Sequence, residues 1–188
     1  MKIVGLSGSI VGSKTRTAMN YVMEAIKKMD PDVHTELIDL ADYDIQFSDG
    51  RNFMDYEGDT KYVAETLIHA DAIIIGTPIF QASIPGTLKN VFDLLPGDGL
   101  ADKIVSIVVT AGTSKHYLIA EQQLKPILTY MKAHVVPRYV FIEDTNFYKK
   151  QITDDDVLIR LERLAEDTLA MTKAYQKYLE EQDKKLGF

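Results

Sequence analysis

Short apolar runs alternate along this chain with longer segments whose apolar residues recur every three or four positions. Apolar runs of four to eight residues are typical of buried strands, and the longer period is typical of helices with one buried face. Strands that alternate with helices favour a parallel sheet with helices on both of its faces. The pattern predicts strands over residues 2–7, 33–38, 71–77, 103–110 and 135–142.

The segments between and after these runs have helical periodicity. In the last of them, Leu161, Ala165 and Leu169 recur at helical spacing, which predicts a face packed in the core. Pro126 interrupts the fourth, so a kink or a boundary is expected there. The predicted helices cover residues 15–29, 60–69, 84–95, 116–132 and 154–180.

Two segments lack a clear pattern. Residues 41–59 combine Asp, Gly, Ser and aromatic residues without periodicity, and such a long loop is either a binding lid or a surface excursion. The charged tail 180–188 is expected to fray unless a partner subunit orders it. Because neither a linker nor a repeat interrupts the chain, residues 1–188 are expected to form a single domain.

Composition narrows the possible functions. The formal net charge of −7 argues against broad binding to nucleic acid, and the absence of cysteine excludes disulfides, thiolate metal sites and a cysteine nucleophile. No apolar stretch approaches the roughly 18 residues of a membrane span. The first residues form a strand pattern instead of a signal peptide. We therefore expect a cytoplasmic protein that binds neither nucleic acid nor a membrane.

The loop between the first strand and the first helix is rich in hydroxyl side chains. Backbone amides at a helix N-terminus and neutral hydroxyls can bind a phosphate, and Lys14 or Arg16 can offset part of its charge. An ordinary helix N-cap with solvated hydroxyls is the alternative. The loop reads Ser7-Gly8-Ser9-Ile10-Val11-Gly12-Ser13-Lys14-Thr15-Arg16-Thr17.

This loop nearly matches a nucleotide P-loop. Gly8, Lys14 and Thr15 have the spacing of G-x-x-x-x-G-K-[ST], but Ser13 occupies the place of the second glycine. Asp39 is only a weak candidate for the metal-binding aspartate that such enzymes need. The loop therefore suits a monophosphate better than a triphosphate, and a P-loop nucleotide-binding enzyme remains the less favoured alternative.

A second candidate loop follows the apolar strand 71–77. It begins at Thr77-Pro78, at the carboxyl end of the strand, where open α/β sheets bind their ligands. Pro78 removes one backbone donor and stiffens the turn, while Ser83 and Pro85 favour the start of a helix. The helix that follows has one apolar face. The loop itself is expected to bind a ligand.

A third candidate loop follows the strand 103–110. Small residues around Gly112 let a flat ligand approach the backbone, and Thr110, Thr113 and Ser114 offer polar contacts to its edge. Three ligand loops at the ends of parallel strands converge on one crevice. The sequence therefore predicts one binding site at this edge of the sheet.

These loops resemble those of the NADPH-dependent FMN reductase family, and most closely the flavin reductases of two-component alkanesulfonate monooxygenase systems. The resemblance covers roughly residues 1–145. It implies a flavodoxin-like three-layer sandwich, with a five-stranded parallel sheet of order 2-1-3-4-5. The motifs that carry it are Ser9 with 13–17, then 77–83 with 86–89 and 93–96, then 110–113 with His116, and finally 124–128.

The resemblance implies a role for each loop. The first would surround the FMN phosphate, the second would line the ribityl chain and the isoalloxazine, and the third would contact the other edge of the flavin. His116 belongs either to the nicotinamide side or to a helix cap. The implied FMN-binding residues are Ser9, Ser13, Thr15, Arg16 and Thr17, then Pro78, Ile79, Phe80 and Ser83, then Thr110, Gly112, Thr113 and Ser114.

Two positions depart from the family pattern. Phe80 stands where relatives often carry tyrosine, so it lacks a hydroxyl contact available to them. Ile84 stands where the alkanesulfonate-type reductases carry a further tyrosine within an irregular helix. Both positions separate this chain from the monooxygenase-linked reductases. FMN is therefore either a prosthetic group that stays bound or a substrate that is released between turnovers.

The resemblance implies an NAD(P)H-dependent FMN reductase. FMN and NADPH or NADH are the expected cofactors, and hydride transfer between stacked rings needs no catalytic side chain or metal. The electrons would pass to a flavin-dependent monooxygenase or to a small-molecule acceptor such as a quinone, an azo compound or a metal oxyanion. A flavodoxin-like electron carrier without a nicotinamide reaction is the alternative.

The resemblance also implies a homodimer or a dimer of dimers, with the helix 84–95 at a subunit contact. Lys89, Asn90 and Asp93 lie on this helix. They form either part of that contact or an ordinary solvated face.

Overall fold

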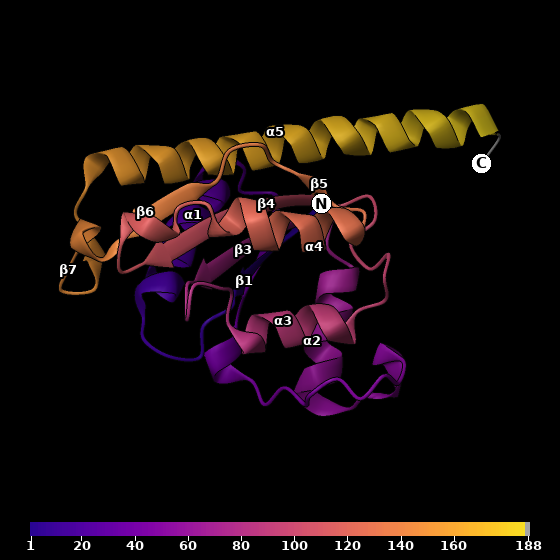
Figure 1. The fold of residues 1–188 in the computed structure, drawn as a ribbon. Coiled ribbons are helices and arrows are strands. Elements are labelled where there is room, and N and C mark those ends of the chain that lie inside the picture. The colour runs from indigo at the N-terminus through magenta and orange to yellow at the C-terminus, as the bar shows by residue number, and fades with distance from the viewer. Residues whose placement is uncertain (187–188) are drawn as a thin grey trace.

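Parallel pairing organises the main sheet of this protein, whose computed structural model describes residues 1–186 (Figure 1). Its strand order is β2-β1-β3-β4-β5, with β6 also paired to β4, and every pairing is parallel. This order confirms the predicted flavodoxin-like topology. The strands are β1 (Lys2–Ser7), β2 (His34–Asp39), β3 (Ala72–Pro78), β4 (Ile104–Ala111), β5 (His134–Val135) and β6 (Val140–Glu143).

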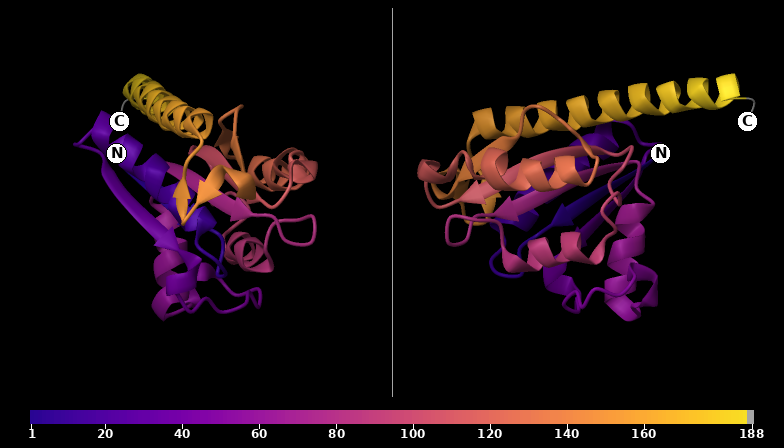
Figure 2. Two further views of the ribbon diagram at one scale, coloured as in Figure 1. Left: turned by 90° about the vertical axis from the view of Figure 1, so that its left-hand side faces the viewer. Right: turned by 45° about the vertical axis from the view of Figure 1, so that its right-hand side comes forward.

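Helices cover both faces of the sheet, as the alternating pattern predicted. Helices α1 (Lys14–Met29) and α5 (Asp155–Leu186) pack on one face. Helices α2 (Gly58–Ile68), α3 (Gly86–Leu94) and α4 (Lys125–Tyr130) pack on the other (Figure 2). The result is the predicted three-layer sandwich.

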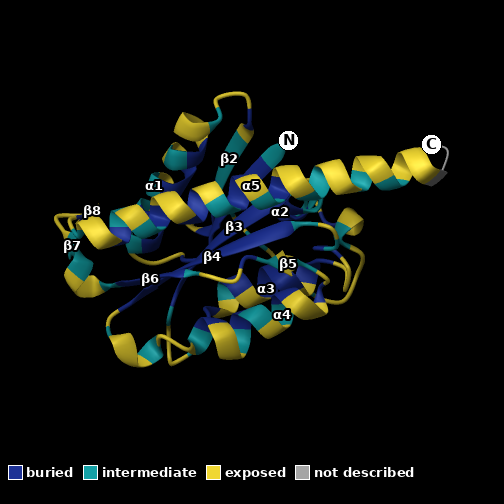
Figure 3. Ribbon diagram, turned by 90° about the horizontal axis from the view of Figure 1, so that it is seen from above, coloured by how far each residue is buried: buried dark blue, intermediate teal, exposed yellow. Residues whose placement is uncertain are grey.

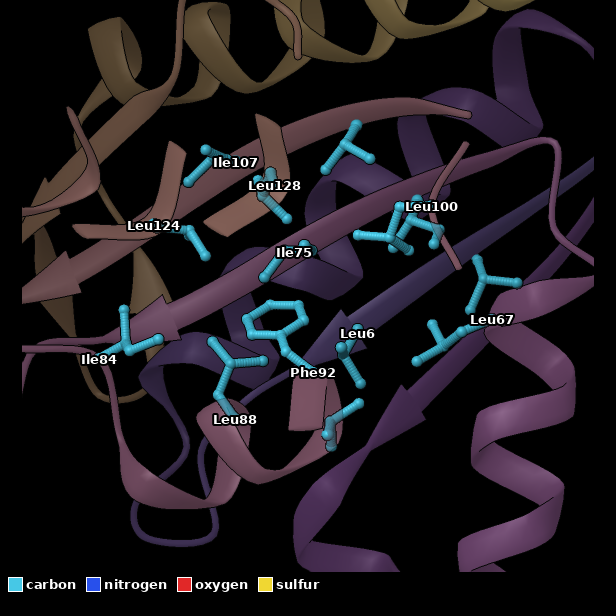
Figure 4. Close-up of a cluster of buried hydrophobic side chains, with 14 of the residues drawn as sticks. Leu6, Leu67, Ile75, Ile84, Leu88, Phe92, Leu100, Ile107, Leu124 and Leu128 are labelled. Atoms are coloured by element: carbon cyan, nitrogen blue, oxygen red, sulfur yellow. The ribbon is translucent and has the colours of Figure 1, made fainter. Parts of the chain in front are cut away.

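Alternate residues of the central strands face the two helix layers, because successive side chains of a strand point to opposite sides. Leu6 and Ile75 pack with Leu88 and Phe92 of α3 in one core cluster (Figure 4). Ile74, which precedes Ile75 on β3, packs in the other cluster with α1 and α5. Both faces of the middle strands are consequently buried (Figure 3).

The fifth predicted strand is divided into two short strands. Ile104 of β4 pairs with His134, while Val108 pairs with Val140, so the neighbouring segment carries two more residues than β4 between these pairs. Pro137 lies in the interruption and cannot donate to a strand ladder. The sequence located this edge of the sheet correctly but missed its irregularity.

The fourth predicted helix is broken into three pieces. A 3₁₀ turn covers Ser114–His116, a π-helical segment covers Ala120–Leu124, and α4 begins at Lys125. The boundary expected at Pro126 is confirmed, since a proline fits the first turn of a helix. Ile84, the first residue of the predicted helix 84–95, lies instead in the loop before α3 and is buried in the core.

The long segment after β2 packs against helix α3. Asn90 is buried and accepts a hydrogen bond from the Ser48 backbone amide, while its own amide donates to the Gln46 carbonyl. Asn90 thus holds this segment and is not part of a solvated helix face. No described residue of the segment lines the cavity presented below, so the surface excursion is favoured over the lid.

Helix α5 continues further than the sequence predicted. Glu180 and Glu181 precede Lys184 and Lys185 by four positions, a spacing that stabilises a helix. The helix extends to Leu186, beyond its predicted end at residue 180, while the fraying expected of this tail stays a prediction. Residues 187–188 lie outside the described part of the chain. The helix projects beyond the sheet at this end (Figure 1).

A small hairpin, β7 (Phe147–Tyr148) and β8 (Gln151–Ile152), precedes α5 and was not predicted. It lies beside the start of α1, where the Thr17 hydroxyl donates to the Lys150 carbonyl across 3.3 Å. Within residues 1–186, no helix has the length and apolar character that crossing a bilayer requires.

Candidate functional site

A cavity of about 420 Å³ lies where the predicted ligand loops meet at the carboxyl edge of the sheet. All three loops contribute to it, together with the segment that follows β6. This volume is within the range of ordinary small-molecule sites. The lining residues are Val11, Gly12, Ser13, Lys14, Thr15, Pro78, Ile79, Phe80, Thr110, Ala111, Gly112 and Asp144.

Hydrogen bonds join the three loops behind this cavity. The buried hydroxyls of Thr15 and Thr110 lie 2.8 Å apart and link the first loop to the third. The Ile79 amide donates to the Thr110 carbonyl across 3.1 Å, which links the second loop to the third. The Gly8 amide donates to the Gly76 carbonyl across 2.7 Å. The relative positions of the loops are therefore fixed by the protein itself.

Gly8 is needed where the first loop crosses the sheet. A Cβ atom at this position would lie 3.0 Å from a Leu88 methyl carbon and 3.1 Å from the Gly76 carbonyl oxygen. This contact is tighter than side chains normally make. The glycine that resembled part of a P-loop thus serves the close packing of the first loop on β3 and α3.

Ser13 and Lys14 bring polar groups to the cavity at the start of α1. Ser13 is the N-cap residue, and its hydroxyl forms no capping hydrogen bond. The Lys14 ammonium lies 2.7 Å from a carboxylate oxygen of Asp144. The first-turn amides, the hydroxyls and one ammonium group are all suited to bind an anion.

Asp144 is a lining residue that the sequence interpretation missed. It follows β6, and its Oδ2 atom lies 3.8 Å from where a Cβ atom on Gly112 would be. The signal was available, because β6 is a further parallel strand whose carboxyl end reaches the same edge of the sheet.

Three predicted residues of the first loop form hydrogen bonds or ion pairs elsewhere in the protein. The Ser9 hydroxyl donates to the Val11 carbonyl across 2.7 Å and so stabilises the loop itself. Thr17 contacts the hairpin, as described above. Arg16 lies 3.3 Å from buried Asp39 and 3.0 Å from Asp42. These three residues support the loop but do not line the cavity.

The pairing of Arg16 with Asp39 also bears on the nucleotide-binding alternative. Asp39 was the weak candidate for a metal-binding aspartate, but its carboxylate is engaged by Arg16 and by the Ala41 amide. Among residues 1–186, no group of three or more His, Cys, Asp or Glu side chains could hold a metal ion. The engagement of Asp39 by Arg16 disfavours a P-loop enzyme, in which this carboxylate would have to bind a metal.

The second loop forms one wall of the cavity with Pro78, Ile79 and Phe80. Pro78 ends β3 and is buried, while the Phe80 ring is 42% exposed at the rim. Ser83 does not line the cavity. Its hydroxyl donates to the side-chain oxygen of Gln123, and its backbone pairs with Phe80.

The third loop contributes Thr110 and Gly112 but not the residues beyond them. Thr113 caps the following 3₁₀ turn by accepting a hydrogen bond from the Lys115 amide. Ser114 and His116 lie in that turn and do not line the cavity. The capping role considered for His116 thus belongs to Thr113.

Tyr139 supports the segment that follows this turn. Its hydroxyl donates to the Tyr117 carbonyl across 2.6 Å. Burial, together with the neighbouring Tyr117 side chain, raises the pKa of Tyr139 well above its usual value, so the hydroxyl remains protonated and keeps donating.

Comparison with known proteins identifies the family. A family model described as NADPH-dependent FMN reductase matches residues 1–146. The chain belongs to the NADPH-dependent FMN reductase family. Membership confirms the predicted family, enzyme class and cofactors: this is an oxidoreductase that uses FMN and a reduced nicotinamide.

Individual relatives agree with this assignment. This FMN reductase family member is 41% identical over 172 residues to an "NAD(P)H-dependent FAD/FMN reductase" of Geobacillus thermodenitrificans, covering 91% of this chain and 93% of the relative. It is 31% identical over 148 residues to the "FMN reductase (NADPH)" of Escherichia coli, covering 77% of this chain and 74% of the relative.

A solved structure of a flavin oxidoreductase has the same fold. The apo form of an "NADH:FMN oxidoreductase (EMOB)" superposes with a TM-score of 0.75 at 26% identity, covering 90% of this chain and 89% of that one. The fold and the family of this FMN reductase therefore agree.

Arg16 is expected to act mainly as the counter-ion of Asp39. Replacing Arg16 with Met leaves a buried carboxylate without its cationic partner, which should lower the free energy of unfolding of the flavin-free protein by about 1–3 kcal/mol. Urea unfolding measures this change, and adding Asp39→Asn should recover most of the loss.

Arg138→Met is the matched control, because Arg138 is paired only at the surface, with Asp167 at 3.7 Å. It should change the stability by less than about 1 kcal/mol. Equal losses in the two variants, or no recovery with Asp39→Asn, would contradict the assigned role of Arg16.

Proposed function

We propose that this protein binds FMN in the cavity at the carboxyl edge of the sheet and reduces it with NADPH or NADH. The observation that carries the proposal is the convergence of all three predicted loops on one cavity of about 420 Å³. The position also agrees with the general rule for ligand sites in open α/β sheets. In this proposal, residues 1–188 act as one FMN-binding domain.

The donors around the cavity fit a flavin monophosphate. Gly12, Ser13 and Thr15 line the cavity at the start of α1, where backbone amides and the helix dipole favour an anion. Gly12 has φ +78° and open space around its Cβ position, so the backbone is accessible there. We therefore assign the phosphate group of FMN to this end of the cavity.

Lys14, rather than Arg16, would offset the phosphate charge. Lys14 lines the cavity, whereas Arg16 is held between Asp39 and Asp42. The Lys14–Asp144 pair is half exposed, so an incoming phosphate can compete for the ammonium group without first breaking a buried ion pair.

The other end of the cavity suits a flat ring system. Pro78, Ile79 and Phe80 supply an apolar wall, and Gly112 on the third loop leaves space for close approach to the backbone. When bound there, FMN supplies the hydride-accepting chemistry. The residues of the chain hold and orient the ring, and no side chain is assigned a catalytic role.

We propose that the electrons pass from the flavin to a small-molecule acceptor or to a flavin-dependent monooxygenase. Phe80 at the rim is half exposed and carries no hydroxyl, so an apolar face of the site is open to a second ring. This feature supports alternating access of nicotinamide and acceptor to one face of the flavin.

We further propose that two copies of the chain associate through helices α3 and α4. A groove of about 530 Å³ between these helices has an apolar floor that includes Phe92 and Ile127, and Tyr130 at its edge is 78% exposed. Lys89 and Asp93, paired at 2.6 Å, border the same groove. An exposed aromatic ring beside an apolar groove is a typical subunit contact.

The flavin content and an anaerobic titration test the proposed activity. We expect purified protein reconstituted with FMN to show the flavin absorbance band, and the band to bleach within seconds of adding NADPH or NADH without oxygen. Rapid bleaching excludes a pure electron carrier. A bound flavin that neither nucleotide reduces would contradict the reductase, and magnesium-dependent ATP binding without flavin would favour the P-loop alternative.

Lys14→Met should weaken FMN binding about tenfold, because it removes a charge-assisted contact to the phosphate. Riboflavin lacks the phosphate, so its affinity should be unchanged. Flavin fluorescence titration of the flavin-free protein measures both values. Lys27→Met, at the far end of the same helix, is the matched control and should bind FMN like the parent. Equal weakening of riboflavin and FMN would contradict the phosphate assignment.

Tyr130→Glu should convert the dimer to a monomer, because it places a charge in the proposed contact. Sedimentation velocity at micromolar concentration measures the state of the flavin-loaded protein. Tyr148→Glu, on the exposed hairpin, is the matched control and should remain dimeric. A parent protein that sediments as a flavin-loaded monomer would contradict the proposed assembly.

A further inference from the structure

The wall of the cavity ends in a tight turn of unusual sequence. Phe80 and Ser83 exchange two backbone hydrogen bonds of 2.9 and 3.0 Å, and Gln81 and Ala82 lie between them. Both central residues have positive φ, 50° for Gln81 and 57° for Ala82. This is the geometry of a two-residue turn in which both central residues are left-handed.

The local sequence does not favour this turn. Such turns strongly prefer Asn-Gly, Asp-Gly or Gly-Gly, because a Cβ atom makes the left-handed region costly for other residues. Gln and Ala have neither the short polar side chain nor the missing Cβ that relieves this cost. Residues held in strained conformations persist only where the surrounding structure fixes them, and they cluster at functional sites.

Gln123 supplies the missing support. Its side-chain amide donates to the Ala82 carbonyl across 3.0 Å, and its side-chain oxygen accepts a hydrogen bond from the Ser83 hydroxyl. Both polar ends of one side chain are thus used on the strained turn. Gln123 lies forty residues away from this turn, so the contact is a tertiary one.

The π-helical segment Ala120–Leu124 presents Gln123 to the turn. Such segments change the direction of side chains relative to an α-helix and are frequent at functional sites. The adjacent Gln122 is exposed, and its side chain makes no hydrogen bond within the described part of the chain. Only one of two neighbouring glutamines therefore contacts the second loop.

We propose that Gln123 is a positioning residue for the flavin site: it holds the Phe80–Ser83 turn in its strained form and so fixes the Phe80 wall before FMN binds. This role rests on the proposed FMN site, but the effect on the turn itself exists without the flavin. Gln123 does not line the cavity, so it acts through the turn and not by contact with the ligand.

Gln123→Ala removes both contacts and should loosen the turn in the flavin-free protein. Hydrogen exchange of the peptide that contains residues 80–83 should become at least about tenfold faster, because two hydrogen bonds are lost. FMN affinity, measured by fluorescence titration, should fall about tenfold for the same reason. Gln122→Ala is the matched control and should change neither value.

The double substitution Gln81→Asn with Ala82→Gly should rescue the Gln123→Ala variant. If that variant were only less stable overall, changing the turn sequence would not restore it. Asn-Gly favours this turn without outside support, and both positions are exposed, so the change does not disturb the core. Added to Gln123→Ala, it should restore exchange and FMN affinity to within about threefold of the parent. If Gln123→Ala fails to fold, Gln123→Glu, which retains an acceptor for Ser83 but loses the donor to Ala82, takes its place in the same comparison.

Unchanged exchange at residues 80–83 in the Gln123 variants would overturn the inference, as would weak FMN binding that Asn-Gly does not restore. A parent protein that binds no FMN would instead overturn the proposed function. Because the exchange measurement uses the flavin-free protein, the two failures are distinguishable.

Discussion

Parallel pairing of the strands is the constraint on which the rest of this structure depends. It brings the carboxyl ends of β1, β3, β4 and β6 to one edge of the sheet. Each of these ends leads into a loop that reaches the same cavity. The backbone bond from Gly8 to Gly76 and the hydroxyl pair of Thr15 and Thr110 then lock the loops to one another. The strand order thus determines where the cavity lies, and the hydrogen bonds between the loops fix their relative positions.

The loops at this edge adopt conformations that their own sequences do not favour. Gln81 and Ala82 have positive φ, and so do Lys149 and Lys150 in the hairpin beside α1. In both turns a side chain from elsewhere accepts or donates a hydrogen bond to the strained segment: Gln123 for the first and Thr17 for the second. Packing of the core layers stabilises the protein, and each of these two contacts ties a strained turn to a neighbouring helical segment.

The charges near the site are balanced locally, although the protein as a whole is acidic. Arg16 neutralises buried Asp39, so it contributes to the loop and not to the cavity. Lys14 pairs with Asp144 at the surface, where an anion can replace the carboxylate at little cost. Two basic residues only two positions apart therefore have different roles, which their order in the sequence does not reveal.

The sequence by itself determined the layered fold, the strand order through its resemblance, and the three loops that line the cavity. These features follow from local patterns: apolar runs, helical periodicity, and glycine, proline and hydroxyl residues at strand ends. Seven of the predicted residues do line the cavity: Ser13, Thr15, Pro78, Ile79, Phe80, Thr110 and Gly112. Ser83 does not line it, but it pairs with Phe80 in the turn behind the cavity wall.

Only the tertiary structure decided which polar side chains face the cavity. Arg16 pairs with Asp39, and Thr113 caps the 3₁₀ turn that follows it. Asp144 reaches the cavity from the end of β6, and the sequence pattern did not show that the strand before it is interrupted at Pro137. The strained turn and its link to Gln123 likewise join segments far apart in the chain. Periodicity reports which side of an element is buried, but the partner of a polar group depends on what packing brings beside it.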